Sequence, residues 1–365
     1  MSLCSYDELL EKIHSIDPVN YSKTRNFTNG AVSRLSPYVS RGVISTRQMM
    51  ESALDRGYSI ANHESFFQQL AWRDYFQRLL QVRPDLYCVP IKLPQIRVAS
   101  TTQLPSAIIN GETGIWALDQ AIDQLYNQGW VHNHLRMYLA MLVCNIAHCS
   151  WQAGGKWMYF HLLDADVASN FASWQWVAGS NSSKKYIANQ ENINKYTLSN
   201  QRGTFLDRPY ETFESMPELN LLQQTQEMLL QSYLPSSDQI LINENEPTFV
   251  YTLFNLDPNW HSNEPGNRIL LIEPSFMHTY PNSKKVMDFV IDLARNIPNI
   301  QVAVMEFKDL QAICKSSVIK YKEHPLMAHF SGVQEERSWM FPSVEGYYPS
   351  FFAYWKACLK TLKKR

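Results

Sequence analysis

The stretch WVHNHLRMYLAMLVCNIAHCSWQAGGKWMYFHLLDADVASNFASWQW, residues 130–176, collects the most informative side chains of this sequence. Two carboxylates, Asp164 and Asp166, stand one residue apart, where an acidic helix N-terminus is the ordinary explanation. Arg136 makes this ordinary explanation less convincing. A charge among apolar helix residues is costly unless it is paired, and an ion pair with one of the two aspartates would provide the partner. Carboxylates, amides and tryptophan rings at these offsets suit a large, planar, redox-active cofactor. Of the five tryptophans in the stretch, those meant here are Trp151, Trp174 and Trp176.

The composition predicts a folded chain of two domains, or of one large domain with an appendage. Its 365 residues are 45% hydrophobic and 13% aromatic, which allows a sizeable core and excludes global disorder. The formal net charge of −1 gives no global case for nucleic-acid binding. Locally, residues 20–50 hold five basic and no acidic residues, which is either a solvated face or a surface for phosphates.

The scattered cysteines and the lack of a recognisable targeting signal lead us to expect a cytoplasmic protein. The six cysteines are scattered, and Cys144 and Cys149 alone form a poor metal signature, so we expect buried thiols and no metal site. Residues 1–18 carry acids early and lack an apolar h-region, so we expect no signal peptide. No run of about 20 apolar residues exists, so we expect no membrane span.

The first part of the chain has helical periodicity and no strand-like alternation. Ser45 is a good N-cap for a helix that ends near Gly57, and Gly129 is a good stop signal. The predicted helices cover residues 46–56, 62–82, 115–128 and 131–151, the last of them ended by Gly154 and Gly155. Residues 84–110 contain prolines and are expected to be irregular.

Beyond residue 235 the pattern of apolar residues changes from helical spacing to short continuous runs. Apolar runs at 248–254, 268–274 and 300–307 predict strands, and residues 283–297 predict an amphipathic helix capped by Ser283. A strand, helix and strand of these lengths indicate a parallel sheet. We therefore expect a mainly α chain with a helical domain over 1–235, a polar linker over 236–246 and a small α/β domain over 247–365. Residues 349–365 predict a final helix with a basic end.

Five blocks of the sequence together resemble the flavin domain of the DNA photolyase and cryptochrome family. They are SRLSPYVSRGVIS (33–45), QLAWRDYF (69–76), GWVHNHLRM (129–137), LLDADVASN (162–170) and WQW (174–176). The resemblance covers about residues 21–195 in matching order and spacing. It implies an all-helical domain that holds FAD in a folded conformation. Without the resemblance, Trp72 would be interpreted as a core residue with surface charges beside it, whereas the resemblance gives it a role toward cofactor and substrate.

The resemblance implies roles for particular residues. The cofactor-binding set is Tyr21, Val32, Ser33, Arg34, Leu35, Ser36, Gln69, Trp72, Arg73, Phe76, Asn133, Arg136, Asp164, Ala165, Asp166 and Asn170. Within it, Arg136 is expected to pair with Asp164, and Asn170 to lie at the reactive ring nitrogen of the flavin. Electrons would reach the flavin through Trp174 and Trp151, while the outer relay position falls near Val98, where no tryptophan exists. Tyr126, Trp116 and Trp157 are the alternatives for that position.

The same resemblance implies a DNA-binding side. A flipped pyrimidine dimer would stack beside the flavin among Arg25, Trp72, Met137, Gln175 and Trp176. A tryptophan such as Trp72 can stack any base, because every base has a π-face. Asn133 and Met137 match the type that repairs cyclobutane dimers, and they make repair of the (6-4) lesion a poor expectation.

Three departures from the family pattern bear on function. Val32 replaces a threonine, Gln69 replaces a glutamate that hydrogen-bonds the damaged base, and the α/β part follows the flavin domain instead of preceding it. The leading hypothesis is a blue-light-dependent photolyase that repairs cyclobutane pyrimidine dimers in single- or double-stranded DNA. The alternatives are a cryptochrome-like photosensor with a protein partner at the C-terminal domain, and a scaffold that has lost its cofactor. The catalytic residues expected for repair are Trp151, Trp174, Asn170 and Gln69.

Overall fold

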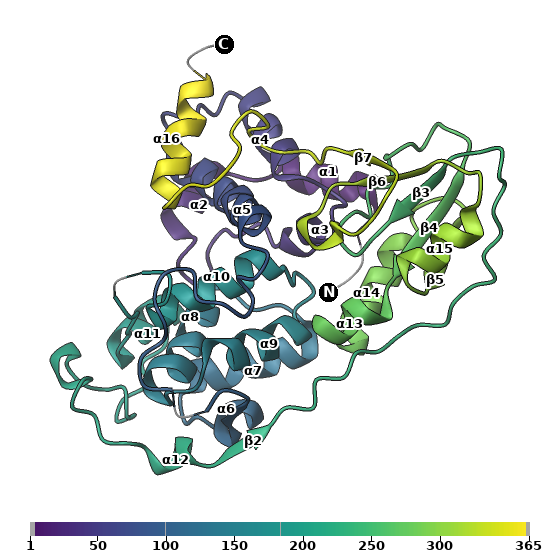
Figure 1. Ribbon diagram of the computed structural model, residues 1–365. Coiled ribbons are helices and arrows are strands. Elements are labelled where there is room, and N and C mark those ends of the chain that lie inside the picture. The colour runs from purple at the N-terminus through teal and green to yellow at the C-terminus, as the bar shows by residue number, and fades with distance from the viewer. Residues whose placement is uncertain (1–3, 99, 183, 363–365) are drawn as a thin grey trace. The chain divides into compact units, whose positions relative to one another are not determined.

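The computed structural model describes residues 4–98, 100–182 and 184–362, which form two compact units (Figure 1). Unit 1 takes the chain up to residue 18, residues 33–84 and the chain from residue 231 onward. Unit 2 takes residues 19–32 and 85–230. Each unit therefore combines stretches that are far apart in sequence. The domains that we predict, 1–235 and 247–365, divide the chain once and in sequence order, unlike these units. Whether the predicted domains fold independently stays a prediction.

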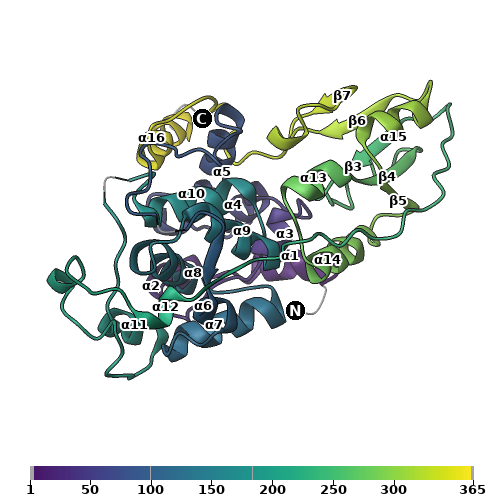
Figure 2. The same cartoon turned by 60° about the horizontal axis from the view of Figure 1, so that its bottom comes forward.

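Unit 2 is mainly helical, and its helices α8, α9 and α10 pack on one another (Figure 2). The helices are α2 (Pro18–Thr24), α6 (Ser106–Asn110), α7 (Trp116–Gln128), α8 (Asn133–Met141), η1 (Leu142–Ile146), α9 (Trp151–His161), α10 (Val167–Ala178), α11 (Gln190–Thr197), η2 (Tyr210–Thr212) and α12 (Asn220–Gln223). Gly129 ends α7 in the left-handed conformation, as predicted.

The helix that we predict over 131–151 is wrong in its second half. The chain leaves α8 through the π-helical turn η1, and a new helix begins at Trp151, where the Ser150 side chain accepts a hydrogen bond from the Ala153 amide. Gly154 and Gly155 lie inside α9 and do not end it. They are needed for space, because a Cβ on Gly154 would lie 2.2 Å from the Trp174 ring.

A small ribbon in unit 2 also departs from the expected absence of strands. Strand β1 (Gln103–Pro105) pairs in antiparallel fashion with β2 (Thr225–Glu227). Both strands have three residues, and β1 ends in a proline, so neither gives a period-2 signal long enough to recognise. The ribbon joins two ends of the unit that lie far apart in sequence.

Unit 1 combines a helical part with a parallel sheet. Its helices are α1 (Tyr6–His14), α3 (Ser36–Ser40), α4 (Thr46–Asp55), α5 (Glu64–Val82), α13 (Pro274–Thr279), α14 (Lys284–Ala294), α15 (Phe307–Cys314), η3 (Pro325–Met327) and α16 (Phe351–Leu362). Ser45 caps α4 in a capping box with Gln48, and Ser283 caps α14, so both predicted caps are confirmed.

The sheet has five parallel strands in the order β5-β4-β3-β6-β7. The strands are β3 (Thr248–Tyr251), β4 (Asn267–Ile272), β5 (Ile300–Val304), β6 (Ile319–Lys322) and β7 (Val333–Glu335). The predicted parallel pairing of the second and third apolar runs is confirmed by β4 and β5. Strands β6 and β7 escaped prediction, since both are short and carry polar residues.

The end of α3 lies against the loop that follows β3. The Leu256 amide donates to the Arg41 carbonyl over 2.9 Å. Gly42 has a φ of +66°, and a Cβ there would lie 2.1 Å from the Phe254 carbonyl oxygen. This close approach of two backbones fixes the helical part of unit 1 to its sheet.

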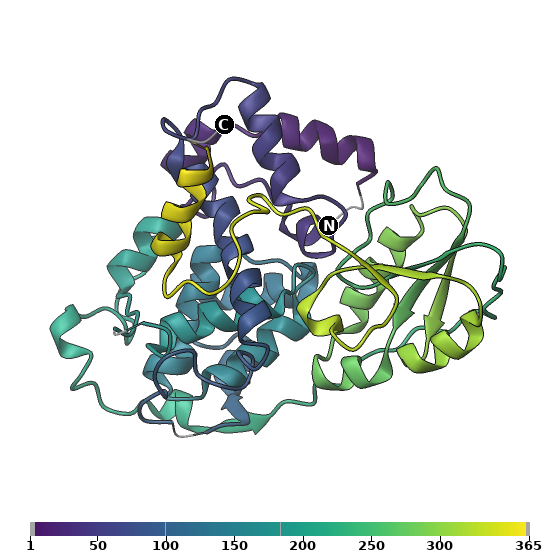
Figure 3. The same cartoon turned by 45° about the horizontal axis from the view of Figure 1, so that its top comes forward.

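Residues 336–350, which we call the strap, connect β7 to α16 (Figure 3). Through the strap, the last helix of the chain reaches α5, on which it packs. The basic end that we predict for this helix falls partly on residues 363–365, which lie outside the described residues. Within the described ranges no helix is both long enough and apolar enough to cross a membrane.

Candidate functional site

Arg136 and Asp164 form a largely buried ion pair in unit 2, as predicted. Arg136 Nη2 donates to Asp164 Oδ2 over 2.8 Å and to Oδ1 over 3.1 Å, and its Nε donates to the Val131 carbonyl over 2.8 Å. The Asp164 side chain is 5% exposed and that of Arg136 is 22% exposed. A buried charge needs such a partner, so the pair fixes α8 to the loop that precedes α10.

Asp166 and Asn170 lie in the first turn of α10. Asp166 is the N-cap, and its Oδ1 accepts from the Ser169 amide over 2.7 Å and from the Ser169 hydroxyl over 2.8 Å. Asn170 Nδ2 donates to the Gly155 carbonyl over 2.9 Å, while its Oδ1 accepts no hydrogen bond from the described residues. The half-buried amide oxygen of Asn170 is therefore available to a donor on a ligand.

Unit 2 holds four more residues of the predicted cofactor-binding set, two of them near this pair in sequence and two far from it. Asn133 begins α8, is exposed, and its Nδ2 lies 3.8 Å from the Met137 sulfur. Ala165 is fully buried between the two carboxylates. Tyr21, on α2, has a pKa raised by burial, which nearby Arg25 partly opposes. Val32 donates its amide to the Gly30 carbonyl in the turn that follows.

The predicted relay tryptophans are buried in the helix core of unit 2. Trp151 begins α9 and packs edge-on against Phe171, with ring centroids 6.4 Å apart. Trp174, on α10, presses on Gly154, one turn further along α9. Of the alternatives for the outer position, Trp157 is buried and donates its Nε1 to the Tyr126 hydroxyl over 3.0 Å. Trp116 is 59% exposed at the start of α7.

The side chain of Gln175 is bonded within the fold. Its side chain is fully buried, its Nε2 donates to the Leu86 carbonyl over 2.7 Å, and its Oε1 accepts from the Ile91 amide over 2.6 Å. Neighbouring Trp176 is 42% exposed and lies 5.6 Å from Tyr186, ring to ring. Trp176 is thus the one of the two that a ligand can touch.

In unit 1, residues 33–36 of the predicted cofactor-binding set form the turn before α3 and its first residue. Ser33 Oγ accepts from the Leu35 amide over 3.4 Å, and Arg34 has a left-handed φ of 55°. Ser36 is the first residue of α3, and Leu35 is buried. The turn brings a cation and two hydroxyls close together in sequence, which suits a phosphate chemically.

Helix α5 presents the other predicted set on one stripe. Gln69, Trp72, Arg73 and Phe76 follow the i, i+3, i+4, i+7 spacing and are all half-buried. Arg73 Nη1 donates to the Ser40 hydroxyl over 3.1 Å, which ties the stripe to α3. Trp72 lies 5.3 Å from Phe76, ring to ring.

Two features of α5 were missed by sequence reasoning. Asp74 is buried and does not lie at the surface, with its carboxylate accepting from the Thr46 hydroxyl over 2.8 Å and the Met340 amide over 2.7 Å. Burial raises its pKa, although both hydrogen bonds oppose the shift. The second feature is Phe351, whose ring stacks on Trp72. Neither has a local signal, because the partners on the strap and α16 lie more than two hundred residues away.

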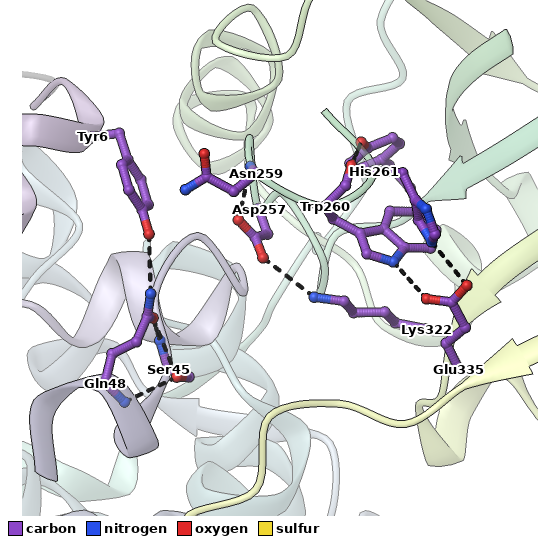
Figure 4. Close-up of polar contacts among 10 residues, drawn as sticks. Tyr6, Ser45, Gln48, Asp257, Asn259, Trp260, His261, Lys322 and Glu335 are labelled. Carbon is purple, nitrogen blue, oxygen red and sulfur yellow. Dashed lines mark hydrogen bonds and ion pairs between the residues drawn. The ribbon is translucent and has the colours of Figure 1, made fainter. Parts of the chain in front are cut away.

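A polar network in unit 1 was also missed (Figure 4). Lys322 Nζ lies 3.3 Å from Asp257, Trp260 Nε1 donates to Glu335 over 2.8 Å, and His261 Nε2 lies 2.8 Å from the same carboxylate. In the same view, Gln48 donates to the Tyr6 hydroxyl over 2.9 Å. Each side chain has a partner, so the network holds the loop after β3 to β6 and β7. No group of three or more potential metal ligands occurs among the described residues.

The donors and acceptors of unit 2 fit the flavin that the resemblance implies. A flavin ring edge offers carbonyl oxygens, a ring N–H and a nitrogen that gains or loses a proton. Arg136 supplies a cation held in place by Asp164, Asn170 supplies an available amide oxygen, and Asn133 supplies an exposed amide. These residues therefore fit the group.

Comparison with known proteins gives a consistent result. Residues 66–233 match the family model described as the FAD binding domain of DNA photolyase. A deoxyribodipyrimidine photo-lyase of Streptomyces griseus is 36% identical over 149 residues, which make up 41% of this chain and 32% of that protein. One of Alkalihalophilus pseudofirmus is 28% identical over 231 residues, 60% of this chain and 47% of that protein. The chain thus spans less than half the length of these two relatives. A solved class III photolyase from Agrobacterium tumefaciens is 27% identical, with 52% of this chain and 42% of that chain covered and a TM-score of 0.44.

Proposed function

We propose that this protein uses FAD and blue light to repair cyclobutane pyrimidine dimers in DNA, because residues 66–233 match the family model described as the FAD binding domain of DNA photolyase. FAD, when bound, supplies the light-driven one-electron chemistry. The protein supplies the position of the ring, a dry site and fixed charges. The helical region would be a photolyase-type flavin domain, with the α/β region as an addition to it.

The buried Arg136–Asp164 pair is the observation that carries this proposal. It fixes the Arg136 guanidinium to Asp164, two residues before the N-cap Asp166 of α10, the helix whose residue Asn170 the family pattern places at the flavin ring. A cation fixed there stabilises negative charge on the ring. Asn170 keeps an amide oxygen available, and an amide can serve both protonated and unprotonated ring nitrogens. The third hypothesis, a scaffold without cofactor, gives no reason for this set of polar groups.

We propose repair ahead of sensing because Trp72, Met137 and Trp176 remain suited to a flipped dimer. Trp72 offers an aromatic platform, Trp176 is exposed, and Met137 matches the cyclobutane-dimer type. Electrons would pass through Trp151 and Trp174, and the hydrogen-bonded Trp157 and Tyr126 are the outer relay that we favour. Damaged DNA is the expected partner.

A photosensor is the second candidate, and two observations favour it. Phe351 covers Trp72, and Gln69 replaces the glutamate that the family uses on the damaged base. A sensor would use light to change the contacts of the α/β region, and the C-terminal region would bind the protein partner. Protease cleavage between residues 200 and 250 would then differ between light and dark, whereas a repair enzyme needs no such difference.

The first test is the absorption spectrum of the purified full chain before and after blue light with a reductant. We expect flavin bands that bleach, followed by light-dependent loss of dimers from ultraviolet-irradiated oligothymidylate. A colourless protein that takes up no FAD contradicts both candidates. Flavin that bleaches while the dimers remain intact contradicts repair and leaves the sensor.

Asp164→Asn tests the residues themselves. The variant leaves the Arg136 guanidinium largely buried without its charge partner, at a cost of about 3 kcal/mol in unfolding free energy. We expect retention of FAD to fall about tenfold or more, measured as flavin absorbance per protein after gel filtration. Asp123→Asn, an exposed change of the same charge on α7, is the matched control and should retain FAD as the wild type does.

A further inference from the structure

One face of the Trp72 ring is covered by an aromatic ring of the chain itself. The Phe351 ring lies 3.9 Å from the Trp72 ring at an angle of 10°, which is the geometry of a stacked pair. Phe351 is 2% exposed, whereas its neighbour Phe352 is 67% exposed. A nucleobase on Trp72 would need the same face at the same spacing, so base and Phe351 exclude each other there.

The strap is held firmly at its start. The Trp339 ring lies between two guanidinium groups, 3.7 Å from that of Arg78 and 4.2 Å from that of Arg337. Arg337 also donates to Gln77 over 2.6 Å and to Glu323 over 2.8 Å. Together with the Met340 amide on buried Asp74, these contacts fix residues 337–342 on α5.

Helix α16 itself is attached mainly through rings. A side-chain hydrogen bond also joins it to α5, from Trp355 Nε1 to Glu64 Oε1 over 2.6 Å, at the exposed start of α5. Residues 345–350 join it to the fixed part of the strap and are mostly exposed. They include Gly346, which has a φ of +83° and open space around its Cα. The Tyr75 hydroxyl on α5 also donates to the Tyr348 carbonyl in this segment, over 3.4 Å. If that bond and the one from Trp355 break, α16 would be free to leave α5 while residues 337–342 stay in place.

We propose that α16 is a displaceable cover of Trp72, and that an unpaired nucleobase competes with Phe351 for the ring. This inference rests on the proposed function, because it takes Trp72 as the base platform. Single-stranded DNA is the partner, since its bases are already unstacked and reach an aromatic face at the least cost. Binding of DNA and docking of α16 then oppose each other.

Phe351→Leu tests the cover in the full chain. Leucine keeps most of the apolar volume and removes the stacking face, so the fold is retained while the cover is weakened. We expect fluorescein-labelled oligothymidylate, titrated in the dark, to bind about tenfold tighter, the loss of one competing stack. Phe352→Leu is the matched control, because it removes an exposed ring from the same helix, and it should bind as the wild type does.

A second variant releases the helix without touching its core. Glu64→Ala removes the acceptor of Trp355, and we expect a smaller gain in DNA affinity of about threefold. Glu51→Ala also deletes one negative charge from the helical part and therefore controls for electrostatics. Its gain in DNA affinity should be smaller than that of Glu64→Ala. In the double variant Trp72→Leu/Phe351→Leu the gain should disappear.

The outcomes separate this inference from the proposed function. Equal DNA affinity in Phe351→Leu, Phe352→Leu and wild type overturns the cover, as does a gain that persists without Trp72. Flavin absorbance and dimer repair are read on the same samples and judge the proposed function alone. A gain in affinity that needs Trp72 supports the cover even where the flavin bands are missing.

Discussion

Single residues in this protein show both what local chemistry predicts and where it ends. The Arg136–Asp164 pair was predictable, because a charge in an apolar helix requires a partner and carboxylates stood nearby in sequence. The burial of Asp74 was not, since its partners Thr46 and Met340 are separated from it by 28 and 266 residues. Burial of a polar side chain at such distances follows from tertiary packing, which no local pattern encodes.

Gly154 gives a prediction at this scale. Replacing a helical glycine by alanine usually stabilises by about 1 kcal/mol, but here the new Cβ would lie 2.2 Å from the Trp174 ring. We expect Gly154→Ala to lower the unfolding free energy by about 2 kcal/mol, measured by urea denaturation. In a Trp174→Leu background the same change should be far less costly, and an equal cost in both backgrounds would contradict contact with the ring as the cause.

At the scale of elements, caps and stops were read correctly where one residue decides them. Ser45, Ser283 and Gly129 each act as the sequence predicts. The pair Gly154–Gly155 was misread, because glycine also permits close helix packing, and only the neighbouring helix distinguishes the two uses. The candidate site shows the same contrast. The positions of Asp166 and Asn170 follow from the local start of α10 and could be predicted, whereas the ring that covers Trp72 comes from the distant helix α16 and could not.

The turn after β6 carries a pH-dependent element. His324 is buried, stacks on Phe254 at 3.9 Å, and its Nδ1 accepts from the Leu326 amide. Burial holds its pKa well below the usual value, and the nearby cations Arg337 and Arg73 lower it further. Below about pH 6.5 the unfolded chain therefore binds a proton that the folded chain refuses, so stability falls as the pH falls.

We expect the slope from this residue to approach 1.4 kcal/mol per pH unit, that is about 1–2 kcal/mol between about pH 7 and about pH 5.5. Urea midpoints of the wild type and of His324→Gln over this range measure it, and the variant should show the shallower dependence. His278→Gln, at an exposed position on α13, serves as control and should follow the wild type. Parallel lines for all three proteins would exclude His324 as the source.

At the scale of the whole molecule, chain order and packing order differ. Unit 1 takes its helices α3, α4 and α5 from residues 33–84 and its sheet, strap and α16 from beyond residue 231. The sequence indicated the change from helices to strands near residue 235 but gave no sign of this return, because it depends on contacts such as Asp74 with Met340.

A chain that ends at residue 235 tests whether the helical part folds alone. It lacks the C-terminal partners of Asp74, Arg78 and Trp72, so we expect residues 33–84 to lose protection from hydrogen exchange while α8, α9 and α10 retain it. Uniform protection across both stretches would instead support the predicted helical domain over 1–235.

The strap and α16 are translated long after α5, the helix on which they pack. A ribosome makes about 5–20 residues per second, so α5 leaves the exit tunnel on the order of 10 s before the strap and α16 exist. Over that interval the apolar face of α5 has none of its final neighbours from residues 336–362, and native closure of unit 1 must wait until α16 has been made. The nascent chain therefore offers Trp72 and Tyr75 to chaperones as a time-limited binding site, which closes when the last helix arrives.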